Sequence, residues 1–231
     1  MKTLGILGGL GPESTMLYYK WLILAYRKRV SNGGYPSIII NSMDVKELLK
    51  MVEANDWAGL TQYLVGGLDR LSRAGADFAI IAANTPHLVF DAVQSRSSIP
   101  LLSIVDATCA RATKLGLKKV GLLGTRFLMQ AKLYPQAFSR AGISIVIPEE
   151  DEQGYVHDKY VTELVNGILL PETKRGLLAT IARMKSRNGI EGVILGGTEL
   201  SLILGDVIDE EVVFLDTTRI HVDAAVTAIL S

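Results

Sequence analysis

"ADFAIIAANTP", residues 76–86, has a near copy in "IEGVILGGTEL", residues 190–200. In each stretch an apolar run typical of a buried strand ends in two small residues, and a threonine with another polar residue follows. A second pair, "LGILGG" at residues 4–9 and "VGLLGT" at residues 120–125, repeats in the same way. Both pairs are about 115 residues apart, which favours an internal duplication, although α/β units resemble one another in any case.

Short β-branched runs alternate with amphipathic helical patterns along the chain. The segment 57–75, "WAGLTQYLVGGLDRLSRAG", places leucines three and four residues apart and ends in a glycine that suits a helix C-terminus. Strands apolar on both faces and separated by helices indicate parallel sheets covered on each side, so the expected fold class is α/β. The predicted strands are Leu4–Leu7, Ser37–Asn41, Asp77–Ala82, Leu101–Ile104, Lys119–Leu123, Ile143–Ile147, Gly192–Leu195 and Val212–Leu215.

The duplication predicts two pseudosymmetric parallel-sheet lobes. The N-terminal lobe would comprise residues 1–96 and 208–231, because the last strand and helix are expected to return to it. The C-terminal lobe would comprise residues 97–207. Ligands of open α/β sheets bind beyond the carboxyl ends of the strands, so we expect the strand-end loops of both lobes to line one cleft.

Composition narrows the class of protein. The chain of 231 residues can bury a sizeable core, and a hydrophobic fraction of 48% excludes a disordered chain. Lys and Arg together number 24, and so do Asp and Glu. The chain therefore has no excess of positive charge that would indicate binding to nucleic acid or to a membrane surface. No apolar run approaches the ~20 residues that span a bilayer, and a single cysteine fits a reducing compartment. We expect a cytoplasmic protein with neither nucleic-acid nor membrane partners.

The loop after the first predicted strand is "GGLGPEST", residues 8–15. Its glycines let the backbone approach a ligand, Pro12 suits a first helical turn, and Ser14 adds a hydroxyl near the positive helix end. The spacing does not match G-x-G-x-x-G, and Asp44, the first acidic residue beyond the second strand, lies too far along the chain for a dinucleotide site. A small carboxylate or phosphate fits better, and a tight turn without a ligand is the alternative.

Polar groups follow three further strands, and they are Asn84, Thr85 and His87, then Thr125 and Arg126, then Thr198 and Glu199. Three polar groups at one strand end, mirrored in the proposed second copy, favour a binding site. The alternative is that Asn84 and Thr85 cap a helix while His87 and Arg126 are solvated. His157 and His221 lie on predicted helices without metal-ligand spacing, so we interpret both as structural or solvated. Cys109 lies in a helix of small residues and is interpreted as an inert thiol.

The motifs "GILGGLGPEST", "AANTPH", "GTR" and "GGTE", in this order and spacing, resemble the aspartate/glutamate racemase family. The resemblance extends from Met1 to the C-terminal helix. It implies two pseudosymmetric lobes with an interlobe cleft for a small amino acid, and activity as an amino-acid racemase (an isomerase). It also implies no metal and no cofactor, pyridoxal phosphate included, and a homodimer.

Members of that family invert Cα with two cysteines, one from each lobe. A thiolate removes the Cα proton on one face while a thiol delivers a proton to the other. The matching catalytic positions here are Ala83, in "AANT", and Gly197, in "GGTE", so both thiols are missing. Cys109 cannot replace them, because its predicted helix lies away from the cleft. A two-thiol mechanism is therefore excluded, and racemisation of aspartate or glutamate is expected to be weak or lost.

By resemblance, the remaining loops still hold a small amino acid or related carboxylate. The residues predicted to contact it are Gly9, Leu10, Ser14, Asn84, Thr85, His87, Thr125, Thr198 and Glu199. Some family members hold the side-chain carboxylate of aspartate with a residue shortly after the second strand. Only Lys46 and Lys50 are candidates there, and Val52 offers nothing, so a preference for acidic substrates does not follow.

Three interpretations of the missing thiols remain open. The first is an atypical enzyme that uses other groups, for instance His87 or Glu199, for slow or one-way proton transfer. The second is a non-catalytic binding protein for a small carboxylate. The third is a cysteine-mutated form of an active racemase, for which glycine would be an odd replacement. The sequence does not decide between the first two.

Overall fold

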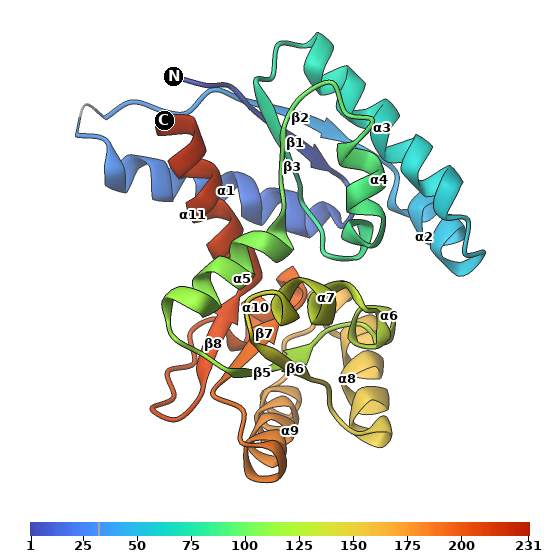
Figure 1. Cartoon of the computed structure of the whole chain (residues 1–231), viewed down its shortest axis with the longest axis vertical. Helices are drawn as coiled ribbons and strands as arrows, with labels where there is room; N and C mark the ends of the chain where they lie inside the picture. Colours follow the sequence, from blue (N-terminus) through green and yellow to red (C-terminus); the bar gives the residue numbers. More distant parts are fainter. Residues whose placement is uncertain (32) are drawn as a thin grey trace. The chain divides into compact units, whose positions relative to one another are not determined.

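A four-stranded parallel sheet forms the centre of each of two structural units (Figure 1). The computed structural model describes residues 1–31 and 33–231. The first unit comprises Met1–Ile104 and His221–Ser231, and the second comprises Val105–Ile220. The strand orders are β2-β1-β3-β4 and β6-β5-β7-β8, so each strand of the first sheet has a counterpart at the same place in the second. This equivalence confirms the α/β fold class and the predicted internal duplication.

The first sheet is covered by helices on both faces. Its strands are β1 (Leu4–Gly8), β2 (Ile38–Ser42), β3 (Phe78–Ile81) and β4 (Leu101–Leu102), and its helices are α1 (Pro12–Arg29), α2 (Val45–Glu53), α3 (Trp57–Arg73), η1 (Thr85–Val89) and α4 (Phe90–Gln94). Successive residues of a strand point to opposite faces. Leu4 and Ile6 accordingly pack against α1 and the C-terminal helix, while Leu7 packs against α2, α3 and α4 (Figure 1).

The second sheet repeats this plan. Its strands are β5 (Lys119–Leu123), β6 (Ser144–Val146), β7 (Gly192–Leu195) and β8 (Val213–Asp216). The associated helices are α5 (Ile104–Lys114), α6 (Arg126–Gln130), α7 (Leu133–Ser139), α8 (Glu150–Thr162), η2 (Leu164–Asn166), α9 (Pro171–Asn188) and α10 (Thr198–Leu204). The C-terminal helix α11 (Thr217–Leu230) follows β8, and its buried residues pack against the first sheet. Leu123, Val193 and Leu195 pack with α8, α9 and α10, while the alternating residues Leu122 and Ile194 are buried on the opposite face.

Local sequence explains where several helices end. The four leucines of α3 at helical spacing are fully buried, as expected for an amphipathic helix on a sheet. Gly189 ends α9 with φ 65°, a left-handed conformation that suits glycine. All eight predicted strands are present among the described residues, with bounds that differ by a few residues.

The predicted lobe boundaries need two corrections. Val213–Asp216 pairs in parallel with β7 and so belongs to the second sheet, whereas we expected it to return to the first lobe. Leu101–Leu102 pairs with β3 in the first sheet, although it lies beyond the predicted boundary at residue 96. The reason is the same in both halves. Each repeated unit contains four strands, and the fourth strand pairs with the sheet of its own unit. Only the part of α11 from His221 onward returns to the first unit.

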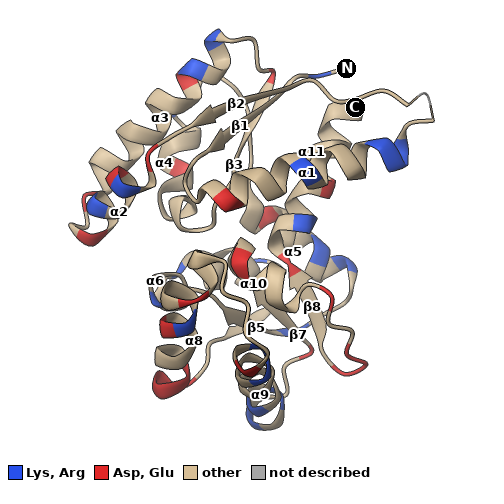
Figure 2. Ribbon diagram, turned by 180° about the vertical axis from the view of Figure 1, so that it is seen from behind, with Lys and Arg blue, Asp and Glu red and all other residues tan. Residues whose placement is uncertain are grey.

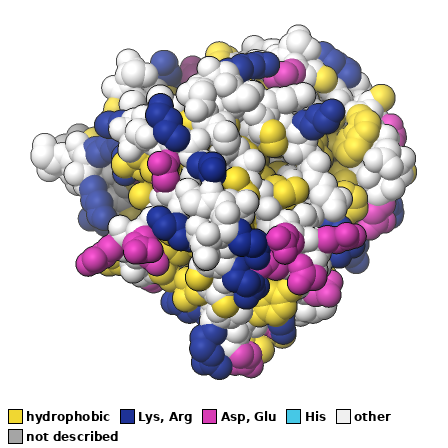
Figure 3. Space-filling model, turned by 60° about the horizontal axis from the view of Figure 1, so that its bottom comes forward, with side chains coloured by type: hydrophobic (Ala, Val, Ile, Leu, Met, Phe, Trp, Pro, Cys, Tyr) yellow, Lys and Arg dark blue, Asp and Glu magenta, His cyan; other side chains and the backbone are white. Residues whose placement is uncertain are grey.

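Charged side chains of both signs are interspersed over the surface. Both signs are present on α8, which is mainly acidic, and on α9, which is mainly basic (Figure 2). The face shown in Figure 3 likewise mixes basic and acidic groups with apolar ones. Within residues 1–31 and 33–231, no helix is both long and apolar enough to cross a membrane.

Candidate functional site

The strand-end loops of the first unit bring its predicted site residues together. β1 and β3 are parallel neighbours with Leu7 opposite Ile81, so the loops that follow them leave the same edge of the sheet. The first loop carries Gly9, Leu10 and Ser14, and the second carries Ala83, Asn84 and Thr85. Asn84 and Ser14 are buried, whereas Thr85 is partly exposed.

Gly9 has a structural role in its loop. Its φ is 74°, and an added Cβ would lie 2.5 Å from the backbone nitrogen of Met43 and closer still to the carbonyl oxygen. Only glycine allows β1 and the loop after β2 to approach so closely. The Gly9 N–H donates to Thr15 Oγ1 at 2.8 Å, so this amide is already bonded within the loop. The predicted ligand contact of Gly9 is therefore not made through its N–H group.

The ring of His87, one of the predicted ligand contacts, is buried and bonded to backbone groups of the first unit. The side chain is 1% exposed. Its Nδ1 lies 2.9 Å from the carbonyl oxygen of Ala83, and its Nε2 accepts the N–H of Ile104 at 3.3 Å. This pattern fits a neutral ring with the proton on Nδ1. Both ring nitrogens are therefore occupied by backbone groups, and the ring fixes the loop that carries Asn84 and Thr85.

His221 plays a similar part beside it. Its Nδ1 is 2.9 Å from the Tyr18 hydroxyl, and its Nε2 is 2.9 Å from the carbonyl oxygen of Leu102. The His87 and His221 ring centroids are 6.3 Å apart. Burial lowers the pKa of His221 to about 4, and burial together with the His221 ring lowers the pKa of His87 to about 3. Both rings are thus neutral anchors of the first unit.

We expect the stability of the protein to fall as the pH drops from about 6.5 to 4. In the unfolded chain both histidines titrate near 6.5, so that state gains protons before the folded state does. Each histidine then contributes a loss of up to ~1.4 kcal/mol per pH unit, and the stability is complete above pH 6.5. Urea unfolding at pH 7 and pH 5 measures the slope, and equal unfolding free energies at the two values would refute it. The carboxyl of Glu152 has a pKa lowered to about 2 from 4.5, so the stability that it contributes is lost at more acidic pH, between about 4.5 and 2.

The corresponding loops of the second unit follow β5 and β7, which are also parallel neighbours. Thr125 caps α6, with its Oγ1 accepting the N–H of Leu128 at 3.3 Å. Thr198 and Glu199 begin α10 and are both buried. The Thr198 hydroxyl donates to Glu199 Oε2 at 2.9 Å.

Tyr160 of α8 joins this group, although nothing in the sequence pattern pointed to it. Its hydroxyl donates to Glu199 Oε2, and its side chain is only 8% exposed. Burial and the neighbouring Glu199 carboxylate raise the pKa of Tyr160 well above its usual value, so the phenol keeps its proton at neutral pH. Glu199 therefore accepts two hydroxyl hydrogen bonds, one from Tyr160 and one from Thr198.

The tyrosine ring occupies the space beside Gly197. The φ of Gly197 is −175°, an extended conformation that any residue adopts, so the backbone itself does not require glycine. A Cβ at this position would lie 2.6 Å from Cε2 and 2.8 Å from Cζ of Tyr160, and nearer still to the hydroxyl. A larger residue at position 197 would therefore require the side chain of Tyr160 to move.

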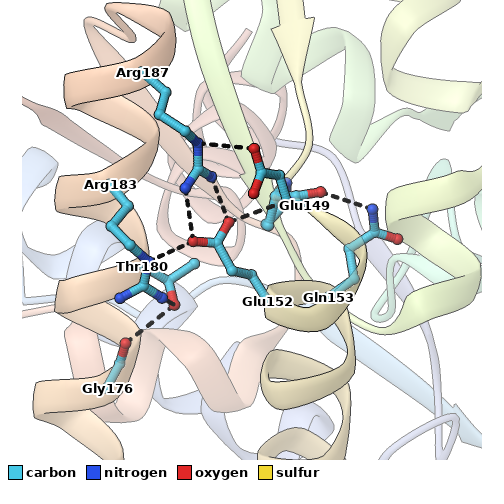
Figure 4. A network of polar contacts seen from close by, with 8 residues as sticks. Glu149, Glu152, Gln153, Gly176, Thr180, Arg183 and Arg187 are labelled. Atoms are coloured by element: carbon cyan, nitrogen blue, oxygen red, sulfur yellow. Dashed lines mark hydrogen bonds and ion pairs between the residues drawn. The ribbon is translucent and has the colours of Figure 1, made fainter.

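A cluster of charged side chains holds α8 against α9 (Figure 4). The buried Glu152 carboxylate accepts Arg183 Nε at 2.5 Å and Arg187 Nη2 at 2.5 Å, and also the backbone N–H of Glu149 at 3.0 Å. Hydrogen bonds from Arg187 and Arg183 lower the pKa of Glu152 to about 2. Because α8 carries Tyr160, the cluster fixes the helix from which the phenol reaches Glu199.

The other sequence candidates lie outside these two groups. Cys109 is partly buried on α5, where its Sγ lies 3.8 Å from the carbonyl oxygen of Ala137, and burial raises the pKa of its thiol. That environment fits the predicted inert thiol. Lys50 forms an exposed ion pair with Glu47 at 2.6 Å. Across the part of the chain that the structure describes, no cluster of three His, Cys, Asp or Glu side chains could hold a metal ion.

Solved structures of Asp/Glu racemases share this arrangement of two parallel four-stranded sheets. A proposed Asp/Glu racemase from Yersinia pestis superposes with a TM-score of 0.91 at 31% identity, covering 100% of both chains. An aspartate racemase homologue from Pyrococcus horikoshii OT3 gives a TM-score of 0.87 at 37% identity, again over 100% of both chains. The class defined by the fold is therefore that of the Asp/Glu racemases.

Comparison of the sequence with known proteins assigns the chain to a particular family. Residues 7–225 match the Asp/Glu/hydantoin racemase family, and the chain belongs to that family. The broad specificity amino-acid racemase RacX of Bacillus subtilis (strain 168) is 24% identical over 234 residues, covering 99% of this chain and 98% of the relative. The resemblance predicted from the loop motifs is thereby confirmed.

Proposed function

We propose that the protein binds a small amino acid or a related carboxylate through loops at the carboxyl ends of its parallel strands, and that it does not invert its ligand by the two-thiol route. The observation that carries the proposal is the matched placement of polar groups after equivalent strands. Asn84 and Thr85 follow β3, and Thr198 and Glu199 follow the equivalent strand β7. Hydroxyl and amide groups at such strand ends suit the carboxylate and amino groups of an amino acid.

The expectation that racemisation is weak or lost rests on the groups present at two positions. Family resemblance assigns the proton-transfer thiols to residues 83 and 197, which here are alanine and glycine. Neither a methyl group nor a hydrogen atom transfers a proton at Cα. Removing an essential acid or base typically forfeits ~10²–10⁴-fold in rate for each proton transfer.

We propose three further properties from the family resemblance and the composition. They are independence from a cofactor, a cytoplasmic location and assembly as a homodimer. Light scattering that shows a monomer at low concentration would remove the last of them.

We expect Thr85→Val to weaken ligand binding about tenfold, because it removes a partly exposed hydroxyl while keeping the shape of the side chain. Calorimetric titration with both enantiomers of aspartate and glutamate, with neutral amino acids and with succinate measures the affinity. Thr113→Val is the matched control, since Thr113 lies at the end of α5 that leads into the amino end of β5. If the whole panel fails to bind, or if both valine variants bind alike, the proposed site is wrong.

A further inference from the structure

The second unit contains a pair of groups suited to proton transfer where the resemblance predicts a thiol. The phenol of Tyr160 fills the volume that a side chain at position 197 would occupy, and it comes within contact distance of the ideal Cβ position. A thiol at residue 197 would extend into this same volume. The phenol oxygen therefore lies where a side chain of residue 197 would begin, even though it is contributed by α8.

Glu199 completes the pair. Its Oε2 accepts the hydrogen of the Tyr160 hydroxyl, so the phenol and the carboxylate form a direct chain for one proton. The Thr198 hydroxyl donates to the same oxygen at 2.9 Å and fixes its position. A phenol that retains its own proton cannot act as a base alone, but it can accept one proton while it passes another to a carboxylate.

We propose that Tyr160 and Glu199 act as a proton relay that removes and returns the Cα proton of a bound amino acid on one face only. This inference rests on the proposed function, because it needs an amino acid at the strand ends. The Cα–H bond breaks and its electron pair stays on the substrate, delocalised into the α-carboxylate. The proton forms a new O–H bond on Tyr160, and the former hydroxyl proton of Tyr160 passes to Glu199 Oε2.

The reverse steps return a proton from Tyr160 to the same face of Cα. The Glu199 carboxyl and the phenol exchange with solvent, so in D₂O the returned atom is deuterium. Ala83, the position that the resemblance assigns to the second proton-transfer group, ends in a methyl group and delivers nothing. The expected reaction is therefore hydrogen–deuterium exchange at Cα with retention of configuration.

The test incubates the unmodified protein in D₂O with each enantiomer of aspartate, glutamate and alanine, at concentrations that calorimetry shows to be saturating. Mass spectrometry follows deuterium at Cα, and chiral chromatography follows configuration. We expect one enantiomer of a binding amino acid to gain deuterium without inversion. Tyr160→Phe should slow this exchange by at least ~100-fold while the dissociation constant changes by less than about threefold. Glu199→Gln should slow it as well.

Tyr155→Phe, on the same helix, is the matched control and should exchange at the original rate. Circular dichroism checks that the Tyr160→Phe protein remains folded, because phenylalanine keeps the ring that packs beside Gly197. Binding without exchange in the unmodified protein, or exchange that survives Tyr160→Phe, would overturn the relay and leave the proposed binding function intact. Absence of binding across the amino acids would overturn both.

Discussion

Replacing Gly197 with cysteine should destabilise the protein by about 2 kcal/mol or more, because the new Cβ would overlap the ring of Tyr160. The ring is buried in the core of the second unit and has little room to move. Tyr160→Ala alone should also destabilise, by about 3 kcal/mol, because it leaves a cavity. The double variant should then be more stable than the sum of the two losses predicts, by at least ~1 kcal/mol.

Urea unfolding of the four proteins in this double-mutant cycle measures the coupling. Gly66→Cys is the control, since an added Cβ there meets nothing within 4 Å and the residue lies in the interior of α3. A helical glycine is intrinsically unfavourable, so that control should be neutral or slightly stabilising. Strictly additive losses at positions 160 and 197 would show that Tyr160 does not determine the residue at 197. Coupled losses would show that restoring a thiol at this position also requires a change at Tyr160.

Ala83→Cys alone should convert exchange at Cα into inversion. Position 83 already carries a Cβ and is partly exposed, so a thiol there adds one atom to an existing side chain. By family resemblance residue 83 serves the face of Cα opposite to residue 197, so a thiol there would let a proton leave on one face and arrive on the other. We expect the rate of inversion to rise at least ~100-fold above that of the unmodified protein.

Chiral chromatography of a binding amino acid after incubation with the Ala83→Cys protein measures this gain. Ala83→Ser has nearly the same size but a hydroxyl that is a poor acid and base at neutral pH, so it should not invert the ligand. Adding Tyr160→Phe to the cysteine variant should abolish the gain. An Ala83→Cys protein that binds and exchanges without ever inverting would mean that the two positions do not act on the same carbon.

Much of the fold could be predicted because its signals are local. Buried parallel strands are continuous apolar runs, and the similarity of Leu4–Gly9 to Val120–Thr125 correctly identified equivalent strands. The lobe boundaries were wrong because β4 and β8 are short edge strands whose pairing is decided by neighbours distant in sequence. A two-residue strand such as Leu101–Leu102 carries almost no periodic signal of its own.

The site was less predictable, because its contacts also join residues that are distant in the sequence. The sequence pattern predicts a ligand contact for His87 because it follows Asn84 and Thr85, but it gives no sign that the ring nitrogens bond to the backbone at Ala83 and Ile104. Tyr160 gave no signal, because an aromatic residue on an amphipathic helix is usually a core residue. Its contact with Glu199 spans 39 residues and depends on how α8 packs on α9 and the sheet. Such contacts exist only once the tertiary structure has formed.

We propose that this member of the racemase family binds an amino acid or carboxylate without inverting it. The most direct test is chiral chromatography of an enantiopure amino acid that binds, after prolonged incubation with the unmodified protein at saturating concentration. We predict that the enantiomeric purity stays unchanged, even where deuterium enters at Cα. Steady formation of the opposite enantiomer, up to an equal mixture, would contradict the claim and would show that groups other than two thiols serve both faces of the carbon.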